Sequence, residues 1–170
     1  MTLETERLLL RPISIADNDY VLAQLNDPGW LKNIGDRKVK TLEAATAYIE
    51  NKILAALEKD PRCAFFVAIR KEDPKQIIIG QCGVFKRDGL EDPDLGFAFL
   101  EAYCGLGYGY ESSSAVLEYA LETMNLNKIV AITSDENIAS QKLLNKLGLQ
   151  YTKDITLPKI EGNNRYFEML

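Results

Sequence analysis

Three glycines at alternate positions, Gly105, Gly107 and Gly109, separate a strand-like run from a helical pattern. The strand-like run covers residues 95–100, and apolar residues recur at helical spacing over residues 111–124. A glycine-rich turn that leads from a strand into a helix directs backbone N–H groups and the positive end of the helix dipole towards an anion. The segment therefore predicts a turn that binds phosphate groups.

Hydrophobic patterning elsewhere predicts one α/β domain over residues 1–170, in which strands and helices share a single mixed sheet. Residues 64–69, 76–85 and 94–100 form an antiparallel run, and Gly80 within it indicates a bulge or a close backbone approach. Residues 30–40 are expected to be a loop. The other expected strands are 8–12, 128–133, 149–157 and 165–169, and the expected helices are 17–25, 41–57, 111–124 and 137–147.

Composition narrows the function classes. The chain contains no histidine, which excludes Ser-His and Cys-His nucleophilic schemes and histidine metal sites, so no metal is expected. No apolar run is long enough to span a bilayer, and no secretory signal precedes Arg7, which favours a cytoplasmic protein away from membranes. The three cysteines lack CxxC spacing and are expected to be free thiols.

The charge balance points to the kind of partner. The net charge is −5 and the sequence pI is about 4.9, without the basic stripe that a nucleic-acid-binding protein shows. Nucleic acid is therefore not an expected partner. An acidic chain leans slightly towards a cationic partner.

Two common phosphate motifs do not fit the glycine segment. A P-loop needs Lys and Ser or Thr after its glycines, and neither residue type follows here. A dinucleotide fingerprint needs glycine at the sixth position, where this chain has Tyr110. A nucleotide-binding module remains a weaker hypothesis.

The segment resembles the cofactor loop of GNAT-type N-acetyltransferases, whose pattern is Gln/Arg-x-x-Gly-x-Gly/Ala. The chain reads Cys104-Gly-Leu-Gly-Tyr-Gly109, and the branch that contains the ribosomal-protein N-terminal (alanine) acetyltransferases also departs from Gln/Arg at the first place. Further segments resemble that branch in the same order along the chain. They are residues 5–12 (Thr-Glu-Arg-Leu-Leu-Leu-Arg-Pro), 79–80 (Ile-Gly), 94–97 (Asp-Leu-Gly-Phe), 137–140 (Asn-Ile-Ala-Ser) and 146–149 (Lys-Leu-Gly-Leu).

The resemblance implies a GNAT-like fold with about six to seven strands and about four helices, splayed at a cofactor cleft. It implies acetyl-CoA as donor and an amine, either a protein N-terminus or a small molecule, as acceptor. The amine would attack the thioester directly in a ternary complex, and a homodimer is the family-level expectation. The implied CoA contacts are Phe99, Leu100, Cys104, Gly105, Leu106, Gly107, Tyr108, Gly109, Asn137, Ser140 and Lys142.

Ser140 is the candidate for the thiolate-side acid. Many family members use a tyrosine four residues before the glycine of their Leu-Gly-Phe element, but this chain has Leu144 there. Helical spacing places Ser140 on the apolar face with Leu143, Leu144 and Leu147. The alternative is a hydrogen bond from its hydroxyl to the carbonyl one turn back. Asn137 is expected to cap the same helix, while Lys142 either reaches a CoA phosphate or is solvated.

The general base and the acceptor pocket are less constrained. Asp94 begins the central strand and Glu101 follows its end, so either carboxylate is a candidate base, directly or through water. Trp30 is a candidate wall of the acceptor pocket, or equally a cover for the core. Cys104 has no histidine to activate it, which disfavours a covalent route. A CoA-binding regulatory protein without catalysis remains the alternative function, because the tyrosine is missing.

Overall fold

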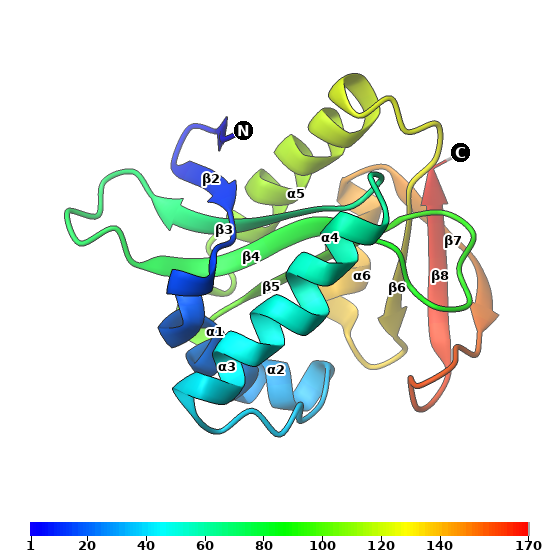
Figure 1. Ribbon diagram of the computed structural model, residues 1–170. Coiled ribbons are helices and arrows are strands. Elements are labelled where there is room, and N and C mark those ends of the chain that lie inside the picture. Colours follow the sequence, from blue (N-terminus) through cyan, green and yellow to red (C-terminus); the bar gives the residue numbers. More distant parts are fainter. Residues whose placement is uncertain (170) are drawn as a thin grey trace.

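The computed structural model describes residues 1–169 and contains one eight-stranded sheet with helices on both faces (Figure 1). All neighbouring strands pair antiparallel except β5 and β6, which confirms the mixed, mostly antiparallel sheet. The order across the sheet is β1-β2-β3-β4-β5-β6-β8-β7. The strands are β1 (Leu3–Glu4), β2 (Leu8–Pro12), β3 (Ala64–Arg70), β4 (Ile78–Phe85), β5 (Asp94–Phe99), β6 (Val130–Ser134), β7 (Leu149–Ile155) and β8 (Asn164–Met169).

Residues 1–169 contain six α-helices, and two of them, α3 and α5, continue into wider π-helical turns. Thr41 caps α3, since its hydroxyl accepts a hydrogen bond from the Ala44 N–H at 3.1 Å. No helix in residues 1–169 combines the length and the apolar character needed to cross a membrane. The helices are α1 (Asn18–Leu25), α2 (Pro28–Asn33), α3 (Leu42–Tyr48), α4 (Ala55–Lys59), α5 (Tyr108–Glu118) and α6 (Ile138–Lys146); the π-helical segments are η2 (Ile49–Leu54) and η4 (Tyr119–Thr123).

The prediction of a loop over residues 30–40 is wrong at its start, because Trp30 lies in the short helix α2. Asp27 caps this helix by accepting the Gly29 N–H at 3.0 Å, and Pro28 occupies the first helical position. An Asp-Pro pair at the cap and first helical position is a favourable helix start. Asp, Pro and Gly are also common turn residues, so this short segment does not show its helical character in the sequence.

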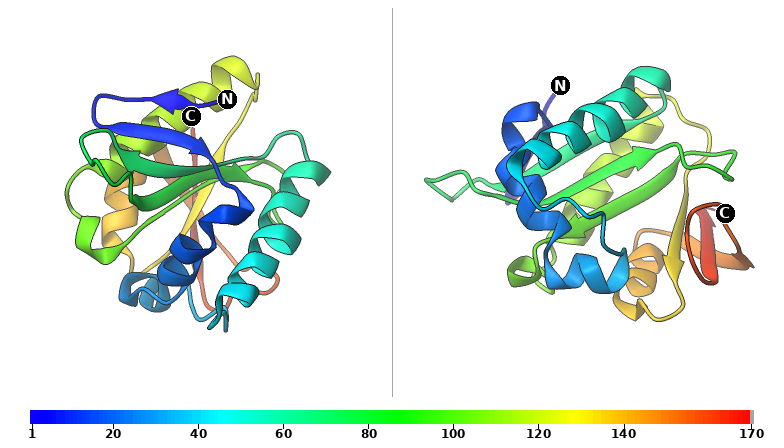
Figure 2. Two further views of the ribbon diagram at one scale, coloured as in Figure 1. Left: turned by 60° about the vertical axis from the view of Figure 1, so that its left-hand side comes forward. Right: turned by 60° about the horizontal axis from the view of Figure 1, so that its bottom comes forward.

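Helices cover both faces of the sheet (Figure 2), and a layer of apolar side chains packs against each face. One layer joins α5 and α6 to the sheet through residues such as Val116 and Leu144. The other joins α1, α3 and η2 to the opposite face through Tyr20, Ala45 and Ile49.

The sheet splits between β5 and β6. Their parallel pairing is limited to Asp94 and Val130, supported by a bond from the Val130 N–H to the Pro93 carbonyl at 3.0 Å. β6 continues its pairing with β8 instead, from Val130 to Ser134. Beyond Asp94, the edge of β5 that faces β6 thus has no partner strand. Free N–H and C=O groups on such an edge can accept an extended ligand as an added strand.

Candidate functional site

A cleft of about 1140 Å³ lies where β5 and β6 diverge. Its walls come from β5, the glycine turn, the start of α6, helix α2, segment η2 and the loop between β7 and β8. Most candidate residues from the sequence line this one cleft, whereas Leu100, Leu106, Tyr108, Asp94 and Glu101 do not. The residues that line it are Trp30, Phe99, Cys104, Gly105, Gly107, Gly109, Asn137, Ser140 and Lys142.

The glycine turn presents its backbone to the cleft. Gly105 and Gly107 have φ angles of +74° and +87°, in the left-handed region that favours glycine. A Cβ atom built on Gly105 would meet nothing within 4 Å, so a ligand has open access to the backbone there. The first intrahelical bond runs from the Glu111 N–H to the Gly107 carbonyl at 3.1 Å. The N–H groups of the first turn of α5 are therefore available to an anion.

Arg7, from the segment before β2, holds this turn in place. Its Nε donates to Glu111 Oε2 at 2.7 Å and its Nη1 donates to the Leu106 carbonyl at 3.0 Å. The guanidinium also lies 4.4 Å from the centre of the Tyr108 ring. Thr5 adds a bond from its hydroxyl to Glu111 Oε1 at 2.6 Å. We call Thr5, Arg7 and Glu111 the N-terminal clamp.

The clamp compensates the negative charge of Glu111, which would otherwise oppose the binding of an anion at the start of α5. A carboxylate in the first turn of α5 would repel phosphate groups if it faced them. Burial raises the pKa of the Glu111 carboxyl, but the hydrogen bonds from Thr5 and Arg7 outweigh burial and leave that pKa below its ordinary value. Glu111 is therefore a charged group compensated by Arg7. No local sequence signal links two residues 104 positions apart.

The start of α6 forms the facing wall. Asn137 accepts the Ser140 N–H at 3.1 Å through Oδ1, which confirms the predicted cap. Within residues 1–169 the Ser140 hydroxyl has no hydrogen-bond partner, so the alternative bond to a carbonyl one turn back is not formed. Ser140 is half-buried and lines the cleft, whereas Leu144 is 1% exposed. A hydroxyl without a partner at a cleft wall is free to meet a ligand.

The two candidate bases lie outside the cleft lining. Asp94 is 1% exposed and accepts hydrogen bonds from Arg87 at 2.9 and 3.1 Å, while its Oδ1 is buried without a partner. Burial raises the pKa of the Asp94 carboxyl, and Arg87 offsets only part of that effect. Asp94 pairs with Val130 at the closed end of the split and does not line the cleft.

Glu101 is exposed at the end of β5, where its backbone is fixed by Asp27. Asp27 Oδ2 accepts the Glu101 N–H at 3.0 Å, while Oδ1 caps α2. One side chain thus connects the helix that carries Trp30 to the strand end before the glycine turn.

Asp27→Ala is expected to lower the free energy of unfolding by about 1–2 kcal/mol, because it removes a helix cap and a second bond to the Glu101 N–H. Asp27→Asn keeps one carbonyl oxygen and should lose less. Urea unfolding of the three proteins measures the effect. Equal stabilities would contradict the role of Asp27 as a connector.

Cys104 lines the cleft next to the glycine turn, but its surroundings disfavour a thiolate. Its Sγ is 3.6 Å from the carbonyls of Phe99 and Leu100. Burial raises the pKa of the Cys104 thiol, and the carboxylates of Asp27 and Glu101 raise it further. The thiol therefore remains protonated near neutral pH, in agreement with the expectation against a covalent route.

Polar groups of α1 and α2 meet the opposite side of the cleft. Trp30 is 7% exposed and packs in the core layer beneath α1 and α3, and it also lines the cleft. Gln24 lines it too, and its Oε1 accepts the Tyr20 hydroxyl at 3.0 Å. Trp30 Nε1 and Gln24 Nε2 are buried without hydrogen-bond partners. Core cover and pocket wall, the two alternatives for Trp30, are thus combined in one residue.

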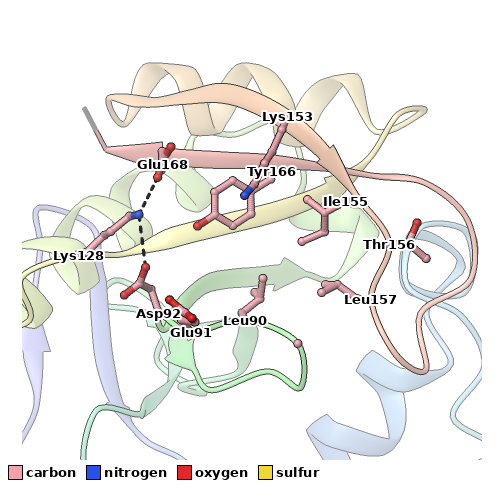
Figure 3. Close-up of a pocket in the computed structure, with 11 residues that line it drawn as sticks. Leu90, Glu91, Asp92, Lys128, Lys153, Ile155, Thr156, Leu157, Tyr166 and Glu168 are labelled. Atoms are coloured by element: carbon pink, nitrogen blue, oxygen red, sulfur yellow. Dashed lines mark ion pairs between the residues drawn. The ribbon is translucent and has the colours of Figure 1, made fainter.

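A second, smaller hollow of about 620 Å³ lies against β6, β7 and β8 (Figure 3). Lys128 projects into it between Asp92 and Glu168, at 3.4 and 2.8 Å from their carboxylates (Figure 3). The hydrogen bond with Glu168 raises the pKa of Lys128 to about 12. The cation already has two partners and the turn from Gly105 to Gly109 does not line this hollow, which leaves the larger cleft as the candidate site.

Comparisons with known proteins agree on one family. Residues 7–150 match the model of the acetyltransferase (GNAT) domain. The chain is 32% identical over 150 residues to the uncharacterized N-acetyltransferase YnaD of Bacillus subtilis, a match that covers 88% of this chain and 83% of that protein.

Solved structures show the same fold at low sequence identity. A ribosomal-protein alanine acetyltransferase from Vibrio fischeri superposes with a TM-score of 0.81 at 17% identity, over 100% of this chain and 96% of that chain. A ribosomal-protein α-N-acetyltransferase in complex with coenzyme A superposes with a TM-score of 0.82 at 12% identity, over 100% and 98% of the two chains.

Proposed function

Because the chain belongs to the GNAT acetyltransferase family, we propose that its cleft brings acetyl-CoA and a primary amine together for direct acetyl transfer. The family membership makes the protein an acetyl-CoA-dependent N-acetyltransferase. Two further points are proposed here. The acceptor is a protein N-terminus or a small-molecule amine, and it attacks while acetyl-CoA is bound, in a ternary complex. The observation that carries it is the split between β5 and β6, with the glycine turn on one wall and Ser140 on the other.

The residues present fit acetyl-CoA. The backbone N–H groups after Gly105 and Gly107, at the start of an eleven-residue helix, suit a pyrophosphate, and the clamp neutralises Glu111 beside it. The unpaired edge of β5 suits the amide groups of the pantetheine arm. Lys142 lines the cleft without an ion pair within residues 1–169, so it is free to meet a phosphate.

Ser140 would act on the leaving group. Attack of the amine nitrogen on the thioester carbonyl forms the amide bond and breaks the C–S bond, which leaves a thiolate that needs a proton or a hydrogen bond. The unpartnered Ser140 hydroxyl is the group at the cleft wall that we assign to this task. Of the candidate bases, Glu101 is exposed enough to accept the amine proton through water, whereas Asp94 is held by Arg87.

Calorimetry is expected to show binding of acetyl-CoA with a Kd between about 1 μM and 1 mM, the ordinary range for enzyme substrates. The binding should be accompanied by thiol release when a suitable amine is added. Failure to bind at millimolar acetyl-CoA would refute both the cofactor site and the reaction. Dephospho-CoA is a useful comparison, because it isolates the contribution of the 3′-phosphate.

A catalytically inactive CoA-binding regulator is the second candidate, and Leu144 is the observation that favours it. Leu144 stands where many family members have the tyrosine acid, and its buried side chain has no polar group. Acetyl-CoA binding without thiol release across a broad panel of amines would support this alternative. Thiol release with any amine would exclude it.

We infer a cytoplasmic location from the cysteines, since Cys63, Cys82 and Cys104 are all free thiols. Cys82 is fully buried next to Ser113, and burial raises the pKa of its thiol to about 11. Unpaired, unreactive thiols of this kind suit a reducing compartment.

A further inference from the structure

The charge of the cleft is opposite to that of the whole chain. The chain has 20 basic and 25 acidic residues, yet the cleft is lined by seven basic residues and two acidic ones. The basic residues are Arg37, Lys52, Lys86, Arg87, Lys142, Lys146 and Lys159, and the acidic ones are Asp36 and Glu161. Clefts lined by one sign of charge concentrate ligands of the opposite sign.

Only part of this charge belongs with the cofactor. Lys142 and Lys146 lie on α6, the helix that packs with α5 and the glycine turn on one face of the sheet. Arg37 and Lys52 come from the loop before α3 and from η2, which cover the opposite face. Lys86 directly follows β4, whose last residue Phe85 packs in that same layer. These three cations therefore belong to the acceptor wall.

The acceptor wall keeps an uncompensated positive charge. Arg87 is paired with Asp94, Lys159 with Asp88 and the acidic Asp36 with Lys40. Within residues 1–169, Arg37, Lys52 and Lys86 form no ion pair. Glu161 is the acidic lining residue that is also unpaired there. Three cations and one carboxylate without ion pairs in the described residues thus line the cleft.

The indole N–H of Trp30, an uncharged hydrogen-bond donor on the same wall, also favours a ligand that carries oxygen atoms. Trp30 is 7% exposed, lines the cleft, and its Nε1–H has no acceptor in the protein. An indole nitrogen can only donate a hydrogen bond, so the partner that would satisfy it is an oxygen. A buried donor without a partner costs free energy, which a ligand oxygen would recover. Trp30 Nε1 is buried in the free protein, so a ligand can bond to it only if the side chains that cover it move aside.

We propose that the acceptor amine carries a carboxylate, which Arg37, Lys52 and Lys86 attract while Trp30 supplies a hydrogen-bond donor. The inference rests on the proposed N-acetyltransferase function and names its substrate class: amino acids and acidic peptide N-termini rather than polyamines. It replaces the lean towards a cationic acceptor that the overall charge suggested. The net charge of the whole chain is a poor guide here, because the acidic residues lie mostly outside the cleft.

Three dipeptide amides with the same alanine N-terminus test the proposal: Ala-Glu, Ala-Gln and Ala-Lys. Their N-terminal amines are matched, so differences in acetylation of the N-terminus, assigned by fragment masses, report the distant charge. We expect kcat/KM to fall in the order Glu, Gln, Lys, with a span of about tenfold, because three solvent-exposed pairs each contribute modestly. The span should shrink at about 1 M salt, where charges are screened over a few ångströms. A Lys peptide used as well as the Glu peptide would overturn the proposal.

Charge removal on the wall provides the second arm. A triple variant, Arg37→Gln with Lys52→Gln and Lys86→Gln, should abolish the preference while leaving the KM for acetyl-CoA within about twofold. The matched control replaces three exposed lysines outside the cleft, Lys32→Gln, Lys59→Gln and Lys75→Gln, and should retain the preference. Loss of preference in the control alone, or its survival in the triple variant, would contradict the assignment.

Direct binding separates this inference from the reaction. Calorimetry of the dipeptides with CoA-saturated protein measures acceptor affinity without turnover. Tighter binding of Ala-Glu with no acetylation would keep the anionic subsite and refute the proposed catalysis. Acetylation with no charge preference in binding or turnover would support the proposed catalysis and refute the subsite for the carboxylate.

Discussion

Ser140→Ala is expected to lower kcat about a hundredfold and to change the KM for acetyl-CoA little, since a positioned proton donor contributes about 10²–10⁴-fold in rate. The hydroxyl lines the cleft, has no hydrogen-bond partner within residues 1–169, and faces the wall that carries the glycine turn. Its loss removes the group that meets the leaving thiolate. Thiol-release kinetics at varied acetyl-CoA concentrations measure both constants.

Two further serine variants sharpen that test. Ser114→Ala removes an exposed hydroxyl on α5 outside the cleft and should leave kcat unchanged. Ser140→Cys restores a group that can supply a proton and should recover part of the rate. If kcat of Ser140→Ala stays within twofold of the parent, the leaving group is served by water or by another residue, and the assignment is wrong.

Arg7→Ala should raise the KM for acetyl-CoA about tenfold while kcat at saturation changes less. The substitution removes the side-chain bonds to Glu111 and to the Leu106 carbonyl, so the turn loses most of its support, while the bond from the backbone N–H of residue 7 to Glu111 remains. It also leaves the Glu111 carboxylate uncompensated beside the site of the phosphates, where its charge opposes binding. Initial-rate kinetics and calorimetry with CoA report the change.

A second variant distinguishes the loss of support for the glycine turn from the repulsion between Glu111 and the phosphates. In Arg7→Ala with Glu111→Gln, the repelling charge is gone, so CoA affinity should recover in part relative to Arg7→Ala alone. Arg62→Ala, which breaks an exposed ion pair with Asp60 far from the turn, is the control. A double variant that binds CoA as weakly as Arg7→Ala would show that the clamp acts through structure alone.

Local patterns predicted the elements that form the site. Alternating glycines after a strand predicted the turn, and Asn137 correctly marked the start of α6. The expected approach at Gly80 is real, since a Cβ there would lie 2.3 Å from the Phe99 ring, and the register of β3 and β4 shifts beside it. These features depend on neighbouring residues in the sequence, which is why they were visible.

The clamp, the acceptor wall and the place of Asp94 depend on residues far apart in the sequence. Arg7 and Glu111 are ordinary charged residues until β2 lies beside α5. The position of Asp94 at the start of the central strand made it a candidate general base. Its burial and its ion pair with Arg87 arise only when the sheet packs, so the sequence does not reveal them. The extra edge strand β1 is too short for a hydrophobic period to reveal it.

The N-terminal clamp also makes the donor site depend on the first strands of the sheet. The contact across 104 residues exists only when the segment before β2 lies beside α5, so the turn from Gly105 to Gly109 has this support only in a chain whose first strands have joined the sheet. A protein that lost the docking of residues 5–12 would therefore lose the support of its donor site, even though the glycine turn itself was unchanged in sequence.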